Sequence, residues 1–186
     1  MMRRLLPFAA ALALGVAACS PDTGQRKPSP TTHRPLEPCH PGCFPAGTVV
    51  ATPEGARPIE SLQAGDVVTL IGPDGGPASG PVGSTFQTCN RLVEVRTESG
   101  TLLTTETQPL CLTGGAFRRA GELAEGDRVW RWEGGQRRAA KVLAVVPTGR
   151  EVPVFNLVVG DSAVFVAGGF LARGKPPPDA GGGGAE

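Results

Sequence analysis

The sequence GTVVAT at residues 47–52 returns as GTLLTT at residues 100–105, 53 positions later. A second piece, LQAGDVV at residues 62–68, returns as LAEGDRV at residues 123–129, 61 positions later. Leu, Gly, Asp and Val keep one offset in that second match, so the abundance of glycine does not explain it. The chain therefore contains two similar units in series, and the second is eight residues longer inside.

Each unit has the pattern of short strands joined by tight turns. A Gly-Thr pair begins an apolar run that ends in threonine, which is typical of a half-buried strand. Turn-forming residues follow at 52–55 in the first unit and at 112–115 in the second. A segment with Leu at its centre then leads to Gly-Asp, which signals a tight turn before a further strand. Two copies are too few for a solenoid, so we expect an all-β fold of two subdomains related by a pseudo-two-fold axis.

The length, the net charge and the composition of the chain exclude several classes of function. A chain of 186 residues is expected to form about one domain. The net charge is +1, no basic block is present and aromatic residues make up 5% of the chain, so we expect no nucleic-acid partner. The glycine-rich stretch at 72–83 has no Gly-Lys-Ser/Thr ending, so we interpret it as a linker between the units and not as a phosphate cradle. No motif implies a cofactor.

The N-terminal residues predict export. The basic start MMRR precedes an apolar run of 14 residues at 5–18, which is too short for a stable membrane span. The run ends in VAAC at residues 16–19, which resembles a bacterial lipobox with Cys19 as the lipidated residue. The alternative is an ordinary cleaved signal peptide followed by an unrelated cysteine. We predict a lipoprotein signal peptide at 1–18 and a protein exported from the bacterial cytoplasm, held in the cell envelope by lipid on Cys19.

The composition also predicts the domain boundaries. Residues 19–38 are rich in Pro, Ser and Thr, which cannot form a core, so we expect a tether there. Residues 39–174 contain the repeated units and form the predicted β domain. Residues 175–186 are rich in Pro and Gly, and we expect a tail without a hydrophobic core.

Four cysteines follow the proposed lipidation site: Cys39, Cys43, Cys89 and Cys111. In an exported chain an even number suggests disulfides, and four cysteines can pair in three ways. A zinc site is the rival interpretation of the Cys39–Cys43 spacing, but this is not a standard knuckle and no second pair is close in sequence. We therefore predict disulfides and no metal.

Cys43 stands at the border between the tether and the β domain, and only the first unit begins with a cysteine. There its sulfur could attack the carbonyl carbon of Gly42 and convert the amide into a thioester. This reaction needs a thiolate or a base, hydrogen-bond donors for the oxyanion and an acid for the leaving amine. Glycine at position 42 leaves the carbonyl unhindered.

The run CFPAGTVVAT at residues 43–52, together with PIE at 58–60 and GDVV at 65–68, resembles the N-terminal block of the Hint domain. Inteins and hedgehog autoprocessing domains share this fold. Residues 154–159 and 164–171 resemble its C-terminal strands, and we include Asn156, in the first of them, among the candidate site residues. The resemblance covers residues 43–174 and implies a horseshoe of two pseudo-two-fold related β subdomains.

The sequence departs from the family pattern at two places. Thr105 fits the family's second block, but Gln108 stands where that block has His. Glutamine cannot transfer a proton near neutral pH, and loss of an acid–base group typically costs about 10²–10⁴-fold. The family usually ends in His-Asn, whereas this chain has Arg-Gly at the matching end, LARG at 171–174. The two histidines, His33 and His40, both precede Cys43, and we interpret His40 as an exposed loop residue rather than a base.

These features lead to three hypotheses. The first is an autoprocessing domain that cannot splice and performs at most slow, single-turnover cleavage at Gly42–Cys43. The second is a Hint fold without chemistry, kept as a binding or structural lipoprotein module and stapled by disulfides. The third is a redox module built on Cys39 and Cys43. The sequence names no protein partner for any of them.

Overall fold

The structure is a computed structural model that describes residues 42–161 and 163–177. The predicted signal peptide and tether lie outside these ranges, as do Cys19, Cys39, His33 and His40. The described strands are β1 Phe44–Pro45, β2 Val49–Thr52, β3 Gly55–Pro58, β4 Val67–Ile71, β5 Pro77–Thr97, β6 Gly100–Thr105, β7 Pro109–Cys111, β8 Phe117–Arg119, β9 Arg128–Glu133, β10 Gln136–Val159, β11 Val164–Ala167 and β12 Phe170–Arg173. The short 3-10 helices η1 Ile59–Ser61 and η2 Ala120–Glu122 complete them.

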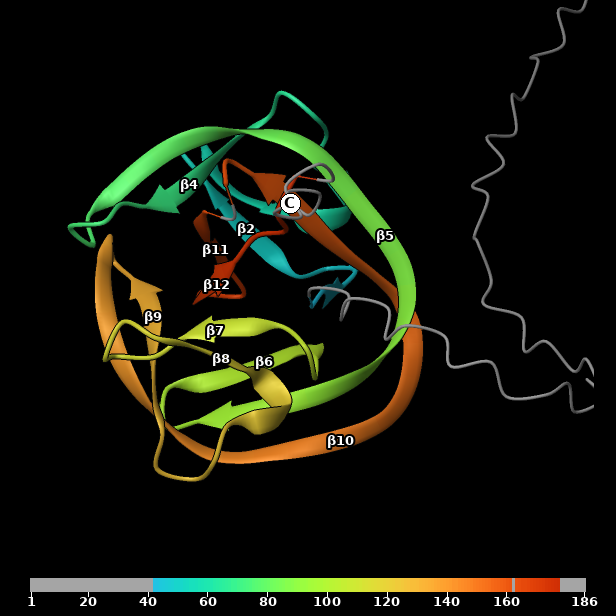
Figure 1. The fold of residues 1–186 in the computed structure, drawn as a ribbon, viewed down its shortest axis with the longest axis vertical. Helices are drawn as coiled ribbons and strands as arrows, with labels where there is room; N and C mark the ends of the chain where they lie inside the picture. Colours follow the sequence, from blue (N-terminus) through green and yellow to red (C-terminus); the bar gives the residue numbers. More distant parts are fainter. Residues whose placement is uncertain (1–41, 162, 178–186) are drawn as a thin grey trace, which may run out of the picture.

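Two long strands, β5 and β10, shape the molecule. They curve around the outside and the shorter strands lie within their arc (Figure 1). β5 and β10 pair antiparallel over most of their length, from Thr97 opposite Val142 to Val82 opposite Val159, with irregularities in register that let the ribbon bend. The predicted all-β architecture is confirmed for the described residues.

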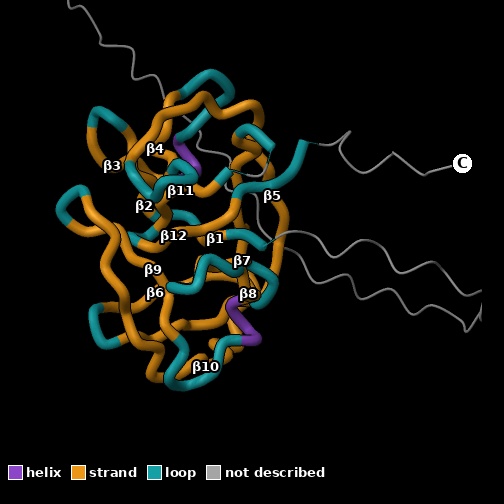
Figure 2. The backbone as a smooth tube through the Cα atoms, turned by 60° about the vertical axis from the view of Figure 1, so that its left-hand side comes forward, coloured by secondary structure: helices purple, strands orange, loops and turns teal. Residues whose placement is uncertain are grey.

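The two units occupy different ends of this frame. β2, β3 and β4 gather at one end, and β6, β8 and β9 lie toward the other (Figure 2). β4 pairs with the first part of β5, and β9 pairs in the same way with the first part of β10. Each long strand thus begins as the partner of the strand before it in the chain and then crosses toward the other unit.

The Gly-Asp turns show the internal symmetry at the level of single hydrogen bonds. Asp66 Oδ2 accepts from Gln63 N at 2.8 Å, and Asp127 Oδ2 accepts from Ala124 N at 2.7 Å. An arginine binds each carboxylate, Arg57 on Asp66 and Arg118 on Asp127. Each turn also follows a 3-10 helix, η1 or η2. The sequence repeat is therefore a structural repeat, as expected.

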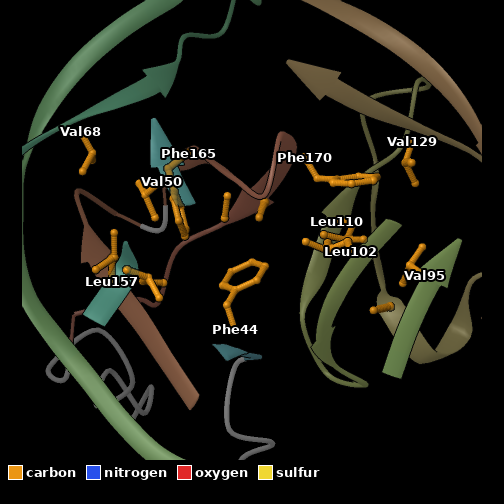
Figure 3. Packing of buried hydrophobic residues seen from close by; sticks show 14 of the residues in the cluster. Phe44, Val50, Val68, Val95, Leu102, Leu110, Val129, Leu157, Phe165 and Phe170 are labelled. Carbon is orange, nitrogen blue, oxygen red and sulfur yellow. The ribbon is translucent and has the colours of Figure 1, made fainter. Parts of the chain in front are cut away.

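The apolar core joins the two units. Phe44 of β1 lies between the group around Val50 and Phe165 and the group around Leu102 and Leu110 (Figure 3). It is fully buried and meets the Phe165 ring edge-on, with 6.1 Å between centroids. Burying such a ring is worth roughly 1.5–3 kcal/mol. The residue after Cys43 is therefore an anchor that fixes the start of the domain.

The interpretation of residues 72–83 as a linker is wrong. The chain reverses between β4 and β5 through a turn in which Gly72 N donates to Gly76 O at 2.9 Å and Gly75 has a φ of +81°. From Pro77 onward the segment is strand and pairs with β4, with Pro81 opposite Val67. The sequence did not predict this strand because it is rich in proline and glycine, and both residue types are usually depleted in strands.

Candidate active site

The bond between Gly42 and Cys43 lies inside the domain, where β1 adds to the edge of β10. Phe44 pairs with Phe155 and Pro45 with Val154. Gly42 is buried, and Cys43 is 2% exposed. The strand pairing places the Gly42–Cys43 bond next to the predicted site residues Thr105, Gln108 and Asn156.

Asn156 binds the carbonyl side of this bond. Its Nδ2 donates a short hydrogen bond to Gly42 O and a second, of 3.2 Å, to Gln108 Oε1. Its own Oδ1 accepts from Leu157 N at 2.7 Å, which fixes the orientation of the amide. Negative charge would develop on Gly42 O during attack by sulfur, and a preoriented donor at that atom is what stabilises it.

Threonines of β6 bind the Cys43 side. Cys43 N donates to Thr105 Oγ1 at 2.9 Å. Cys43 O accepts from Thr105 N at 3.0 Å and from Thr104 Oγ1 at 2.9 Å. Both threonines are fully buried. The Cys43 nitrogen, which would be the leaving group in thioester formation, is therefore hydrogen-bonded to a hydroxyl oxygen. Together the three hydrogen bonds fix the backbone of Cys43 in the site.

Gln108 connects the site to the C-terminal strand. It is fully buried, and its Nε2 donates to Arg173 O and to Pro109 O, each at 3.1 Å. Its backbone also limits position 42, because a Cβ there would lie 1.9 Å from Gln108 Cα. Glycine at the scissile position is thus required by packing as well as by access to the carbonyl.

The matching C-terminal residues do not enter the site through their side chains. The Arg173 guanidinium lies over the Phe117 ring, 5.4 Å from its centroid, and only the Arg173 carbonyl reaches Gln108. Gly174 is buried, and a Cβ at this position would lie 2.7 Å from Val159 Cγ2 and 3.2 Å from Leu157 O. An asparagine at 174 would not fit without a shift of β10.

Burial makes Cys43 a poor acid. Loss of solvation raises the pKa of its thiol to about 11, and the nearby Lys175 cation opposes part of that rise. A pKa of about 11 leaves roughly one thiol in 10⁴ ionised at neutral pH. The nucleophile is therefore in place but is protonated in nearly all molecules.

Sequence reasoning missed Lys175, which it assigned to the tail. Lys175 is 6% exposed, its N donates to Leu157 O at 2.8 Å and it bridges to Val158 in parallel fashion. Its Nζ lies 3.4 Å from the centroid of the Phe86 ring. The domain thus extends past the predicted end at Gly174. The sequence held one weak signal, since Lys175 is the single cation in residues 175–186.

The cysteines do not all behave as the disulfide prediction required. Cys43 and Cys111 carry thiols, so neither of them forms a disulfide, whether with the other or with a third cysteine. Cys111 is half-buried, and its Sγ donates weakly to Leu112 O at 3.6 Å. Cys89 is disulfide-bonded. Its partner lies outside the described residues, where the sequence has two cysteines, Cys19 and Cys39.

No group of three or more His, Cys, Asp or Glu side chains within 42–161 and 163–177 is placed to hold a metal ion. In the same ranges no helix has the length and apolar character needed to cross a membrane.

Comparison with solved structures identifies the fold. The Ssp DnaB mini-intein variant M86 matches with a TM-score of 0.68 and 16% identity, over 75% of this chain and 97% of the other. A DnaB intein from Synechocystis sp. PCC 6803 matches at 0.66 and 17%, over 72% and 99%. The bacterial intein-like domain from Clostridium thermocellum matches at 0.61 and 24%, over 72% and 98%.

These likenesses show the fold alone, because every identity among them is below 25%. The domain therefore has the Hint fold of inteins and intein-like domains, as the sequence resemblance implied. No protein-family model and no curated protein matches the chain.

Proposed function

We propose that this chain is an autoprocessing domain of an exported lipoprotein that cannot splice and that forms a thioester at Gly42–Cys43 slowly, in a single turnover. The observation that carries the proposal is a pair of hydrogen bonds at the two ends of the Gly42–Cys43 peptide bond. Asn156 donates to the carbonyl oxygen of Gly42, and Thr105 accepts from the nitrogen of Cys43. The bond that would react is thus held by one hydrogen bond at its carbonyl oxygen and by another at its nitrogen, which suits attack by the adjacent cysteine.

The chemistry would proceed by attack of Cys43 Sγ on the Gly42 carbonyl carbon. The C–S bond forms, charge gathers on the oxygen bound by Asn156, and the C–N bond then breaks as the Cys43 nitrogen takes a proton. Water or an added thiol would next break the C–S bond of the thioester, which separates the segment ending at Gly42 from the chain that begins at Cys43. The pKa of about 11 for Cys43 and the non-titrating Gln108 both support a low rate.

Loss of splicing is supported at the other end of the domain. Splicing in the resembling family uses a terminal Asn, and position 174 is a buried glycine with no space for that side chain. The cleavage that remains open to this chain is therefore on the N-terminal side.

The direct test is incubation of the full mature chain with a small thiol, followed by intact mass measurement under reducing conditions. We expect slow appearance of a fragment beginning at Cys43, together with the thioester of the preceding segment. Cys43→Ala should give neither product. Cys111→Ala is the matched control, because it removes the other described thiol and should cleave like the parent.

A module without chemistry is the second candidate, and burial of Cys43 is the observation that favours it. Enclosed sulfur at 2% exposure is also what a structural cysteine shows. An uncleaved chain after prolonged thiol treatment, with Cys43 reactive only once the protein is denatured, would decide for this candidate.

The envelope location is part of the same proposal and rests on the VAAC sequence at 16–19. Cys19→Ala should prevent lipidation and move the protein out of the membrane fraction. A variant that still sediments with membranes as fully as the parent would show that lipid on Cys19 is not the anchor.

A further inference from the structure

We propose that Lys175 is a catalytic residue of this site, taking the proton from Cys43 Sγ and delivering it to the Cys43 nitrogen as the Gly42–Cys43 amide breaks. The inference rests on the proposed thioester chemistry and supplies the proton carrier that Gln108 cannot be.

The placement of Lys175 is the first support. Its backbone N–H donates a hydrogen bond to the carbonyl of Leu157, the residue after Asn156. The lysine backbone therefore lies close to Asn156, which donates to the Gly42 carbonyl. Its Nζ sits over Phe86, and Phe86 is the strand partner of Asn156. Phe86 also packs against the small cluster of Cys43, Leu92 and Val154. The ammonium group therefore lies over a ring that packs against the cluster containing Cys43.

Charge gives the second support. Among the described residues, the charged group that acts on the pKa of Cys43 is Lys175, and the one that acts on Lys175 is Cys43. Burial lowers the pKa of Lys175, and the Cys43 thiolate raises it in part. A buried lysine with a lowered pKa holds a larger neutral fraction, which is the form that can accept a proton.

The step conserves protons and electrons. Neutral Lys175 takes the Sγ proton, and the thiolate attacks the Gly42 carbonyl carbon to give an oxyanion held by Asn156. When the C–N bond breaks, the ammonium of Lys175 gives the same proton to the Cys43 nitrogen and becomes neutral again. No outside acid, base or oxidant is needed, and the product is the thioester with a free Cys43 amine.

Two variants separate proton transfer from charge. Lys175→Arg keeps a cation but cannot give up its proton near neutral pH, and Lys175→Met keeps an aliphatic side chain over Phe86 without charge. Lys141→Gln is the matched control, since Lys141 is exposed at the far part of β10. Thermal melts confirm that each variant is folded before rates are compared.

We expect thiol-induced cleavage to fall by about 10²-fold in both Lys175→Arg and Lys175→Met, as for loss of an acid–base group, and to be unchanged in Lys141→Gln. The wild-type rate should rise with pH and level off once Lys175 is neutral. The Lys175→Met rate should keep rising until the thiol itself ionises, at pH about 11 or above. Equal rates in Lys175→Arg and wild type would overturn the shuttle, leaving only a role for charge.

A readout independent of cleavage is the ultraviolet absorbance of the Cys43 thiolate, taken as the difference from Cys43→Ala at each pH. Cys43 should ionise at lower pH in Lys175→Arg than in Lys175→Met, because only arginine keeps a cation beside the thiol at high pH. Equal titrations of Cys43 in Lys175→Arg and Lys175→Met would show that residue 175 does not act on the thiol and would overturn the proposal even if the chain cleaves. Different titrations with no cleavage in any variant would instead overturn the proposed autoprocessing. A branched product carrying residues 19–42 on Lys175 Nζ would show that the lysine is the acyl acceptor and not the shuttle.

Discussion

The two repeated units have the same turns but contribute different groups to the site. Each ends its repeated strand with a threonine, Thr52 in β2 and Thr105 in β6. The hydroxyl of Thr52 donates to Gly55 O at 2.6 Å within its own exposed turn, whereas that of Thr105 is buried and binds Cys43 N. The first unit thus supplies the thiol and the second supplies what holds it. Duplication built a symmetric frame, and the site lies where the two copies are no longer equivalent.

The largest effect should come from restoring a titratable group in the second unit. Gln108→His should raise thiol-induced cleavage by up to about 10²–10⁴-fold, because imidazole would then stand next to Asn156 and could protonate the leaving amine. The measurement is the cleaved fraction over time by intact mass. We expect the wild type to remain largely uncleaved over the same period.

The control for this gain is Cys43→Ala in both backgrounds, which should abolish cleavage. Brisk Cys43-dependent cleavage by the wild type would contradict the view that Gln108 is disabling. A histidine variant that is folded but no faster would show that protonation by residue 108 does not limit the rate.

The next effect tests whether the frame is energetically symmetric. Leu62 and Leu123 are repeat counterparts, 3% and 6% exposed, and both belong to the main core. Leu62→Ala and Leu123→Ala should each lower the free energy of unfolding by about 2–5 kcal/mol, through lost burial and the cavity left behind. Urea unfolding measures both. A difference between them beyond this range would mean that one unit carries most of the stability.

A smaller effect should separate the paired threonines. Thr105→Val leaves the buried Cys43 N–H without its acceptor, so we expect a loss of about 1–3 kcal/mol in unfolding free energy and slower cleavage. Thr52→Val removes an exposed bond and should change stability by no more than about 0.5 kcal/mol. Denaturant unfolding and the thiol assay report the two quantities. Equal costs for the two variants would argue that Thr105 has no special link to Cys43.

The smallest effect concerns the Gly-Asp turns. Hydrogen bonds from Gln63 N and Ala124 N, and then the neighbouring arginines, lower the pKa of Asp66 and Asp127 from the ordinary 3.8. A lowered folded-state pKa means that the stabilisation is complete above 3.8 and is lost as the pH falls through the lower folded value. Asp66→Asn and Asp127→Asn should lower the melting temperature slightly and equally at neutral pH, with a smaller difference from the parent at low pH. Unequal shifts in the two melting curves would show that the turns are not equivalent.

The sequence predicted the β architecture well because the repeated residues have strong local conformational preferences. Gly-Asp turns and Gly-Thr strands specify their own geometry, and the two copies supported each other. It also nominated the residues that the structure brings together at the candidate site, which are Gly42, Cys43, Thr105, Gln108 and Asn156. Lys175 could not be found in this way, because its burial depends on a bridge to Val158 and on Phe86, both distant in the chain. The strand at the start of β5 was missed because pairing with β4 overrides the local preference of Pro and Gly.

The disulfide at Cys89 changes what a cut at Gly42–Cys43 would achieve. Cys43 and Cys111 carry thiols, and the remaining cysteines of the sequence, Cys19 and Cys39, both precede Gly42. Within one chain the bridge therefore spans the scissile bond, so backbone cleavage alone would leave a two-chain molecule. The domain would part from its N-terminal segment only after a second, reductive event. Cleavage would show on a reducing gel and be silent on a non-reducing one, and release from the proposed lipid anchor would report the redox state of the compartment.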